Sequence, residues 1–187
     1  MEERPVQGVR MTDIATEAGI SRQALYLHFS TRAELLIATT LHIDEVQGSD
    51  ERLQASRAAK DGVERLDAFI EAWGNYIPEI HGVAKAMLAV LDTDADAAEA
   101  WGRRMQAMRE GCQAAIVALE KDKTLSPEWT VDTATDLLWT MLSVRNWEQL
   151  TKDCGWSKKE YVDRLQMQAK QIFVRDQPTK RRRPGKA

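Results

Sequence analysis

Apolar residues recur at three- and four-residue spacing along most of the chain, and this period constrains the fold more than any other feature. The longest stripe covers about five helical turns and consists of Trp101, Met105, Met108, Cys112, Ile116 and Leu119. A second stripe consists of Val63, Leu66, Ile70, Trp73 and Ile77. Sustained two-residue alternation and Asn-Gly turns, which mark strands and hairpins, are missing. The sequence therefore predicts an all-α fold.

Local stop and start residues divide the first fifty residues into short helices. Gly19 tolerates a positive φ, so it is expected to end a helix over 11–18. Ser21 is expected to cap a second helix that runs to about residue 29. Thr31 and Glu34 have the spacing of a capping box, which predicts a longer helix from there. This longer helix is expected to end at residues 48–50, Gly-Ser-Asp.

Further boundaries are predicted in the remaining part of the chain. Pro78 suits the first turn of a helix, where a missing N–H costs nothing, so a new helix is expected to begin there. The same logic places a helix start at 126–128, with that helix ending at Gly155. Ser157 and Glu160 form a second predicted capping box, which opens the last helix.

Composition excludes several classes of function. The 187 residues carry a net charge of −3, so the overall basic excess of many nucleic-acid binders is missing and any such function must depend on placed residues. No run approaches the roughly 18 apolar residues of a membrane span, and the N-terminus lacks the apolar core of a signal peptide. Two cysteines, Cys112 and Cys154, are too few for a disulfide framework. We expect a cytoplasmic protein with no membrane partner.

No catalytic or metal-binding pattern is present in the sequence. The histidines at 28, 42 and 81 do not have metal-ligand spacing, and there is no Ser-His-Asp arrangement or Gly-rich phosphate loop. We therefore expect no catalytic residues, no metal, no cofactor and no enzymatic activity.

Residues 11–29 have the pattern of a helix-turn-helix, two short helices that meet at a glycine turn. An apolar wedge between the helices is expected from Ile14, Ala15, Ile20 and Leu25. The second helix would then present Arg22, Gln23, Leu27 and His28 outward. Arg and Gln are the side chains that match guanine and adenine edges in the major groove, although surface arginines are ordinarily just solvated.

This segment resembles the tetracycline-repressor (TetR/AcrR) family of transcriptional regulators. The family pattern is matched without a gap by Asp13-Ile14-Ala15, Ala18-Gly19-Ile20-Ser21, Leu25-Tyr26-Leu27-His28-Phe29 and Thr31-Arg32-Ala33-Glu34-Leu35-Leu36. The resemblance implies phosphate contacts from Tyr26 and Arg32, and from Arg10 just before the first helix. It implies that Ser21 and Arg22 begin the recognition helix and that Gln23, Leu27 and His28 add base or sugar contacts.

The family pattern also implies a full helix before the motif, and here only about ten residues precede Met11, with Pro5 and Gly8 among them. We therefore expect a DNA-binding domain over 1–48 that is truncated at its N-terminus and binds DNA weakly or not at all. A helical ligand-binding and dimerisation domain is expected over 49–175. A basic tail over 176–187 is expected to be disordered.

Six tryptophans and several methionines in the larger domain suit either a plain core or a flexible apolar pocket. The pocket candidates are Trp73, Tyr76, Trp101, Met105, Met108 and Trp139. The resemblance implies a small apolar or aromatic effector there, a homodimer formed by the helices between about 131 and 173, and a repressor released from a palindromic operator. Two alternatives remain: a helical small-molecule-binding protein or enzyme that has lost DNA binding, and a protein-interaction adaptor.

Overall fold

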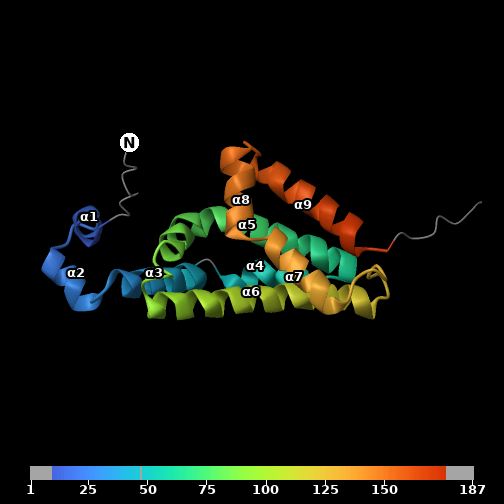
Figure 1. The fold of residues 1–187 in the computed structure, drawn as a ribbon, viewed down its shortest axis with the longest axis horizontal. Coiled ribbons are helices and arrows are strands. Elements are labelled where there is room, and N and C mark those ends of the chain that lie inside the picture. The colour runs from blue at the N-terminus through green and yellow to red at the C-terminus, as the bar shows by residue number, and fades with distance from the viewer. Residues whose placement is uncertain (1–9, 47, 176–187) are drawn as a thin grey trace, which may run out of the picture. The chain divides into compact units, whose positions relative to one another are not determined.

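The computed structural model describes residues 10–46 and 48–175, which are almost entirely helical (Figure 1). In chain order the helices are α1 (Met11–Glu17), α2 (Arg22–His28), α3 (Arg32–Val46), α4 (Ser49–Arg57), α5 (Gly62–Leu88), α6 (Ala95–Lys121), α7 (Val131–Met141), α8 (Val144–Glu148), a short π-helix η1 (Gln149–Asp153) and α9 (Lys158–Phe173). The only β contact in the described residues is an isolated antiparallel bridge between Leu125 and Val174. The predicted all-α fold is confirmed.

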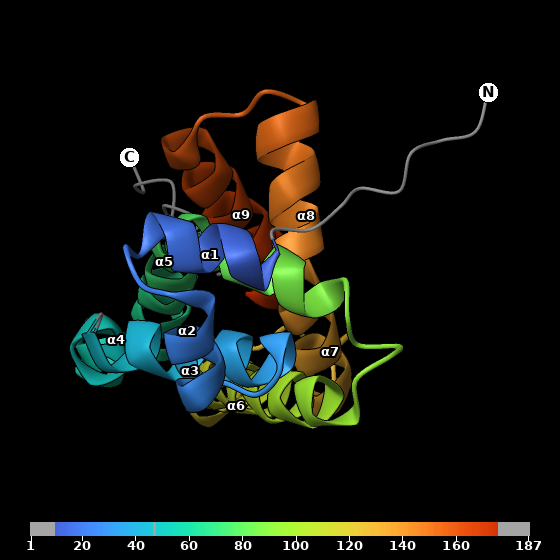
Figure 2. The same cartoon turned by 90° about the vertical axis from the view of Figure 1, so that its left-hand side faces the viewer.

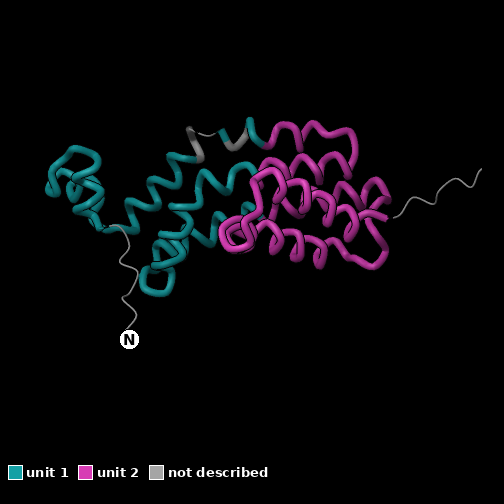
Figure 3. Tube along the Cα trace, turned by 90° about the horizontal axis from the view of Figure 1, so that it is seen from above, with its two compact units in different colours: residues 1–52, 75–108 teal, residues 53–74, 109–187 magenta. Residues whose placement is uncertain are grey.

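The chain packs into two compact units, drawn in different colours in Figure 3. Unit 1 comprises Met1–Arg52 and Asn75–Met108, and unit 2 comprises Leu53–Gly74 and Arg109–Ala187. Helices α5 and α6 each contribute one segment to each unit, so packing does not follow the chain in order. The domain boundary near residue 48 stays a prediction. The expectations of a truncated start and of a disordered basic tail fall on residues 1–9 and 176–187, outside the described residues.

Local caps lie where the sequence predicts them. The hydroxyl of Ser21 accepts a hydrogen bond from the backbone N–H of Ala24 at 3.0 Å, and α2 begins at the next residue. The hydroxyl of Ser157 likewise accepts from the N–H of Glu160 at 3.1 Å and begins α9. Gly19 has φ +66, the left-handed conformation that separates α1 from α2.

The capping box at the start of α3 differs from its prediction in one half. The hydroxyl of Thr31 does accept from the N–H of Glu34, at 3.1 Å. The carboxylate of Glu34, however, accepts from the hydroxyl of Ser30 at 2.8 Å and from its backbone N–H at 2.6 Å, one residue before the expected partner. These two hydrogen bonds hold the pKa of Glu34 below its ordinary value, since they stabilise the charged form.

Pro78 lies inside α5, so the predicted helix start at this position is wrong. A proline inside a helix removes one backbone hydrogen bond and crowds the carbonyl four residues earlier, at a cost of about 3 kcal/mol. The side chains on either side of it, Ile77 and Ile80, are both buried. Full burial of one such side chain contributes roughly 1.5–3 kcal/mol, so packing on both sides of the proline offsets its cost.

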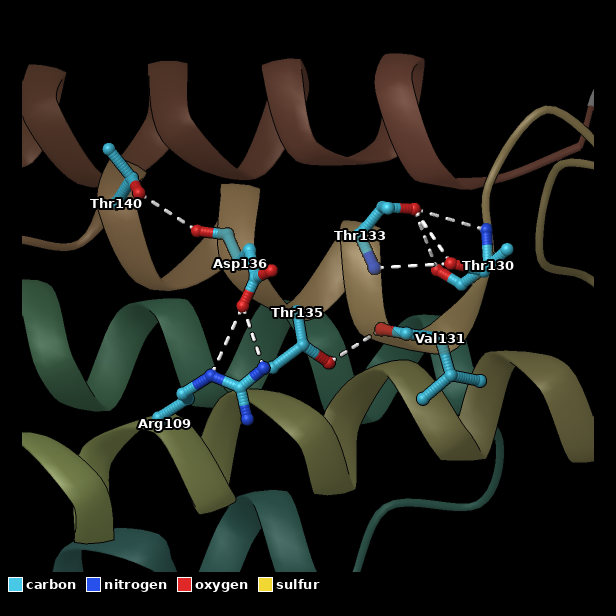
Figure 4. Close-up of polar contacts among 7 residues, drawn as sticks. All are labelled: Arg109, Thr130, Val131, Thr133, Thr135, Asp136 and Thr140. Carbon is cyan, nitrogen blue, oxygen red and sulfur yellow. Dashed lines mark hydrogen bonds and ion pairs between the residues drawn. The ribbon is translucent and has the colours of Figure 1, made fainter.

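The predicted helix from 126 to 155 begins later and is divided. The backbone N–H of Ser126 donates to the carbonyl of Phe173 at 2.8 Å, which ties this segment to the end of α9. The helix begins only after Thr130. The hydroxyl of Thr130 accepts a hydrogen bond from the backbone N–H of Thr133, and the hydroxyl of Thr133 accepts one from the backbone N–H of Thr130 (Figure 4). Ser143 then caps a separate helix, α8, because its hydroxyl accepts from the N–H of Asn146.

The sequence also left α4 unpredicted. This nine-residue helix has Leu53 as its one large apolar residue, so it lacks the stripe on which the other predictions depend.

Unit 2 holds most of the largest fully buried side chains of the described residues. They come from the first part of α5 and from α6, α7 and α9, and include Leu66, Ile70, Ile116, Leu119, Leu138, Tyr161 and Phe173. Ion pairs join these helices at their edges. Lys170 contacts Asp67 at 2.7 Å, and the guanidinium of Arg109 donates to one carboxylate oxygen of Asp136 at 2.7 and 3.1 Å (Figure 4).

Candidate nucleic-acid interface

The first two helices form a compact helix-turn-helix in which α1 and α2 contact and cross each other (Figure 2). Met11, Ala15 and Leu25 are buried between them, and Ile14, Phe29 and Leu35 pack against this cluster. Three of the four predicted wedge residues therefore lie in the expected place. The fourth, Ile20, is 43% exposed, because the turn carries it outside the crossing point.

Gly19 is required in this turn by its backbone conformation and not by lack of space. A Cβ at Gly19 would meet nothing within 4 Å, but its φ of +66 is strained for an L side chain. The backbone N–H groups of Gly19 and Ile20 donate to Thr16 and Ala15 at 3.1 and 3.0 Å, so the chain reverses immediately after α1.

The solvent-exposed part of α2 carries four candidate residues. Arg22, Gln23, Tyr26 and Leu27 all lie on it, and Leu27 is 85% exposed. Because residues four apart are neighbours on a helix, the four form two rows, Arg22 with Tyr26 and Gln23 with Leu27. In the first row the guanidinium carbon of Arg22 lies 5.3 Å from the centroid of the Tyr26 ring, within cation–π range.

The remaining DNA-contact candidates lie at the two ends of α2 and at the starts of α1 and α3. Ser21 uses its hydroxyl to cap α2, and His28 is exposed, with its ring 6.5 Å from that of Phe29. Arg10 precedes α1, and its backbone N–H donates to the carboxylate of Asp13 at 3.1 Å. Arg32 is the first residue of α3 and is half-buried.

A second feature of unit 1 is an apolar groove of about 220 Å³. Three helices line it: α3 with Ile37, Thr40 and Leu41, α5 with Met87, and α6 with Ala100, Arg103, Arg104 and Ala107. A smaller cavity shares Thr40, Met87 and Arg104 with the groove and adds Trp101. The two arginines place positive charge at the border of an otherwise apolar space.

The structure distributes the six predicted pocket residues over both units. Tyr76, Trp101, Met105 and Met108 belong to unit 1, and Trp73 and Trp139 to unit 2. Of the six, Trp101 borders one of the two cavities just described. Tyr76 is buried, with the guanidinium carbon of Arg52 3.4 Å from its ring centroid and Arg104 3.5 Å from its hydroxyl.

Sequence reasoning missed the contribution of α3 to the groove. Thr40 and Leu41 were assigned no function, because the aromatic and methionine residues that indicated a pocket are absent from this helix. A groove that needs three helices from separate parts of the chain leaves no linear motif.

Two kinds of feature are absent from the described residues. Within 10–46 and 48–175, no three His, Cys, Asp or Glu residues gather in a way that could hold a metal ion. In the same part of the chain, no helix combines the length and the apolar character that crossing a membrane requires.

Comparison with known proteins agrees with the helix-turn-helix. Residues 1–39 match the family described as bacterial regulatory proteins, tetR family. This N-terminal segment is thus similar to the DNA-binding part of the TetR family. It is 28% identical over 134 residues to the HTH-type transcriptional regulator EthR of Mycobacterium tuberculosis, and this match covers 68% of the chain and 59% of EthR. It is 36% identical over 76 residues to the HTH-type transcriptional activator FasR of Mycolicibacterium smegmatis, covering 40% of the chain and 34% of FasR.

Solved structures of TetR-type regulators share the fold. A TetR transcription regulator from Haloarcula marismortui superposes with a TM-score of 0.69 at 15% identity, covering 89% of this chain and 88% of that one. NalD of Pseudomonas aeruginosa, the secondary repressor of the MexAB-OprM multidrug efflux pump, superposes with a TM-score of 0.64 at 20% identity, covering 92% and 90%. The chain spans about three fifths of EthR and about one third of FasR, the curated relatives that it matches.

Proposed function

We propose that this protein is a DNA-binding transcriptional regulator that acts as a repressor. The observation that carries the proposal is the division of α2 into a face held by buried Leu25 and an exposed face with Arg22, Gln23, Tyr26 and Leu27. A helix held in this way by a crossing partner can enter the major groove as a rigid element. Arg22 would donate its two parallel N–H groups to a guanine, while Tyr26, Arg32 and Arg10 would contact phosphates.

The regulator is proposed to act as a homodimer on a palindromic operator, because two recognition helices related by a two-fold axis match two half-sites. The proposed contact region is 131–173, which contains α7, α8 and α9. Met167, on α9, is 46% exposed, and Trp139 and Trp156 are only half-buried, so apolar surface remains there for a second copy. Light scattering of the full chain at micromolar concentration tests this, and the 21.2 kDa monomer alone would contradict it.

The effector is proposed to bind in the groove between α3, α5 and α6, as a small molecule with an apolar body. Helix α3 connects the groove to the DNA-binding face directly. Leu35 packs against the helix-turn-helix cluster, and Ile37, Thr40 and Leu41 line the groove on the same helix. A ligand that binds better when α3 is displaced would shift the population away from the DNA-binding conformer, typically by about 1–3 kcal/mol of coupling.

DNA binding is tested with the full chain by fluorescence anisotropy on duplexes selected from a random library. Arg22→Ala should weaken binding by about 1–3 kcal/mol and relax the preference at one base pair of each half-site. Tyr26→Phe keeps the ring and removes the hydroxyl, so it should weaken all sequences by a similar, smaller amount. If Arg22→Ala weakens every sequence equally while Tyr26→Phe alters base preference, the proposed docking of α2 is wrong.

Effector binding is tested by thermal-shift screening of small apolar compounds against the full chain. Ala107→Phe places a ring in the groove and should abolish the shift that a ligand produces. Ala98→Phe, on the same helix but outside the groove lining, is the matched control and should preserve it. A compound that binds while the selection returns no DNA would favour the alternative, a helical small-molecule-binding protein without operator binding.

A further inference from the structure

Leu27 is the most exposed large apolar side chain that the described residues contain. At 85% exposure it exceeds Leu41 at 62% and Met167 at 46%. A single exposed leucine needs no explanation on an ordinary surface. Leu27, however, lies on the short helix whose opposite face forms the core of the helix-turn-helix, so it points away from the domain.

The row that Leu27 forms with Gln23 differs chemically from its neighbour. Arg22 and Tyr26 contact each other through a cation–π interaction, and both are charged or polar at their tips. Gln23 and Leu27 place an amide and an isobutyl group one helical turn apart. Four residues of helix rise by about 6 Å, and successive base pairs are about 3.4 Å apart. The two side chains therefore span roughly two base-pair steps.

The major groove offers one partner for each member of this row. A glutamine amide can donate to N7 and accept from the N6 amino group of adenine in a bidentate pair. The C5-methyl of thymine is the one apolar group on base edges in this groove, and an alkyl side chain packs against it. We propose that Gln23 and Leu27 together recognise an A·T-containing step of each half-site, Gln23 through an adenine edge and Leu27 through the methyl group of a nearby thymine. This inference rests on the proposed DNA-binding function.

The thymine methyl can be removed without altering any hydrogen bond, which makes a sharp test possible. Binding sites are first selected from a random duplex library with the full-length wild-type chain. Each thymine of the selected duplex is then replaced singly by deoxyuridine, and dissociation constants are measured at fixed salt. At one position of each half-site, replacing thymine by deoxyuridine should weaken DNA binding by the wild type about fourfold. This factor corresponds to the free energy of burying one methyl group.

The variants assign that methyl contact to Leu27. Leu27→Ala should bind the thymine and uracil duplexes equally, whereas Leu27→Met, which keeps an apolar side chain of similar length, should retain the difference. Gln23→Ala should bind the selected duplex with at least about fivefold lower affinity. It should also relax the preference for adenine near the uracil-sensitive position. Melting curves should be unchanged for Leu27→Ala, since its side chain is solvent-exposed.

A second arm of the test uses cytosine at the sensitive position. Changing the T·A pair to C·G removes the methyl, and 5-methylcytosine restores it. The wild type should regain part of its affinity on methylation, and Leu27→Ala should not.

The possible results separate the two proposals. A uracil difference that persists in Leu27→Ala, or uracil duplexes that bind the wild type as tightly as thymine at every position, overturns this inference and leaves DNA binding standing. If the selection returns no preferred sequence, the proposed function fails and this inference fails with it.

Discussion

The helix-turn-helix of unit 1 and the helical core of unit 2 use their apolar residues in opposite ways. In the helix-turn-helix, the buried cluster consists of Met11, Ala15 and Leu25, and apolar Ile20 and Leu27 remain exposed. In unit 2, side chains as large as Tyr161 and Phe173 are completely buried. The difference is one of purpose, because a surface that binds a partner must stay accessible whereas a core gains free energy from every side chain it removes from water.

This comparison indicates where stability resides. A few buried side chains contribute only a few kcal/mol, which is well below the conformational entropy cost of ordering this segment. The helix-turn-helix therefore depends on its caps and on α3, while unit 2 has enough buried area to unfold cooperatively. The following substitutions test that difference, from the largest expected effect to the smallest.

Truncating one leucine in each region should give two different results. Leu138→Ala creates a cavity in the core of unit 2 and should lower the free energy of unfolding by about 3–5 kcal/mol. Leu25→Ala should unfold α1 and α2 and abolish DNA binding, while the main thermal transition of unit 2 stays nearly unchanged. Thermal melts followed by circular dichroism measure the main transition, and hydrogen exchange measures the unfolding of α1 and α2. Equal shifts of the main transition would contradict the comparison, since the two regions would then unfold together.

Two glycine substitutions should have opposite signs. A Cβ on Gly62 would lie 2.5 Å from the backbone nitrogen of Leu119, so Gly62→Ala must move backbone in unit 2 and should cost about 1–3 kcal/mol. Gly102 is the matched control, because it lies inside α6 with nothing within 4 Å of its Cβ position. Gly102→Ala should stabilise the protein by about 0.5–1 kcal/mol. Urea denaturation measures both, and a tolerated Gly62→Ala would show that unit 2 is less tightly packed than described.

The phenol of Tyr161 is expected to be a net cost to unit 2. Among the described residues its hydroxyl has no hydrogen-bond partner, so Tyr161→Phe should stabilise the protein by about 1 kcal/mol. Burial raises the pKa of Tyr161 above its ordinary value of 10.0. The folded state then holds its proton more tightly than the unfolded state, so stability is lost as pH rises above 10. Tyr161→Phe should lose less stability above pH 10 than the wild type. If the variant is instead less stable than the wild type at neutral pH, the hydroxyl of Tyr161 has a hydrogen-bond partner.

The two cysteines should report the same core without any change in stability. Burial raises the pKa of Cys112 to about 12, whereas Cys154 is exposed. Because the thiolate is the reactive form, a thiol reagent at pH 8 should label one cysteine of the native chain quickly and both in denaturant. Cys154→Ser should remove the fast phase. Rapid labelling of Cys112 in that variant would mean that unit 2 opens readily.

Caps and turns could be predicted from the sequence because the interacting atoms lie within four residues of one another. Ser21 and Ser157 cap α2 and α9 through the N–H three residues later, and Gly19 ends α1 by its own conformational freedom. The exposed face of α2 follows in the same way from the position of buried Leu25. The outward candidates Arg22, Gln23, Leu27 and His28 are therefore exposed as predicted, although their contacts with DNA stay predictions.

The sequence by itself thus determined the helical class, the helix-turn-helix and its exposed residues, since each depends on local spacing. Tertiary structure decided that α5 continues through Pro78, because the burial of Ile77 and Ile80 outweighs the local cost of the proline. It also decided that 126 stays outside α7, because a hydrogen bond from Ser126 to Phe173 holds it. The groove between α3, α5 and α6 exists only once three distant segments pack together, and free energies of packing between distant residues cannot be read from the order of residues in a chain.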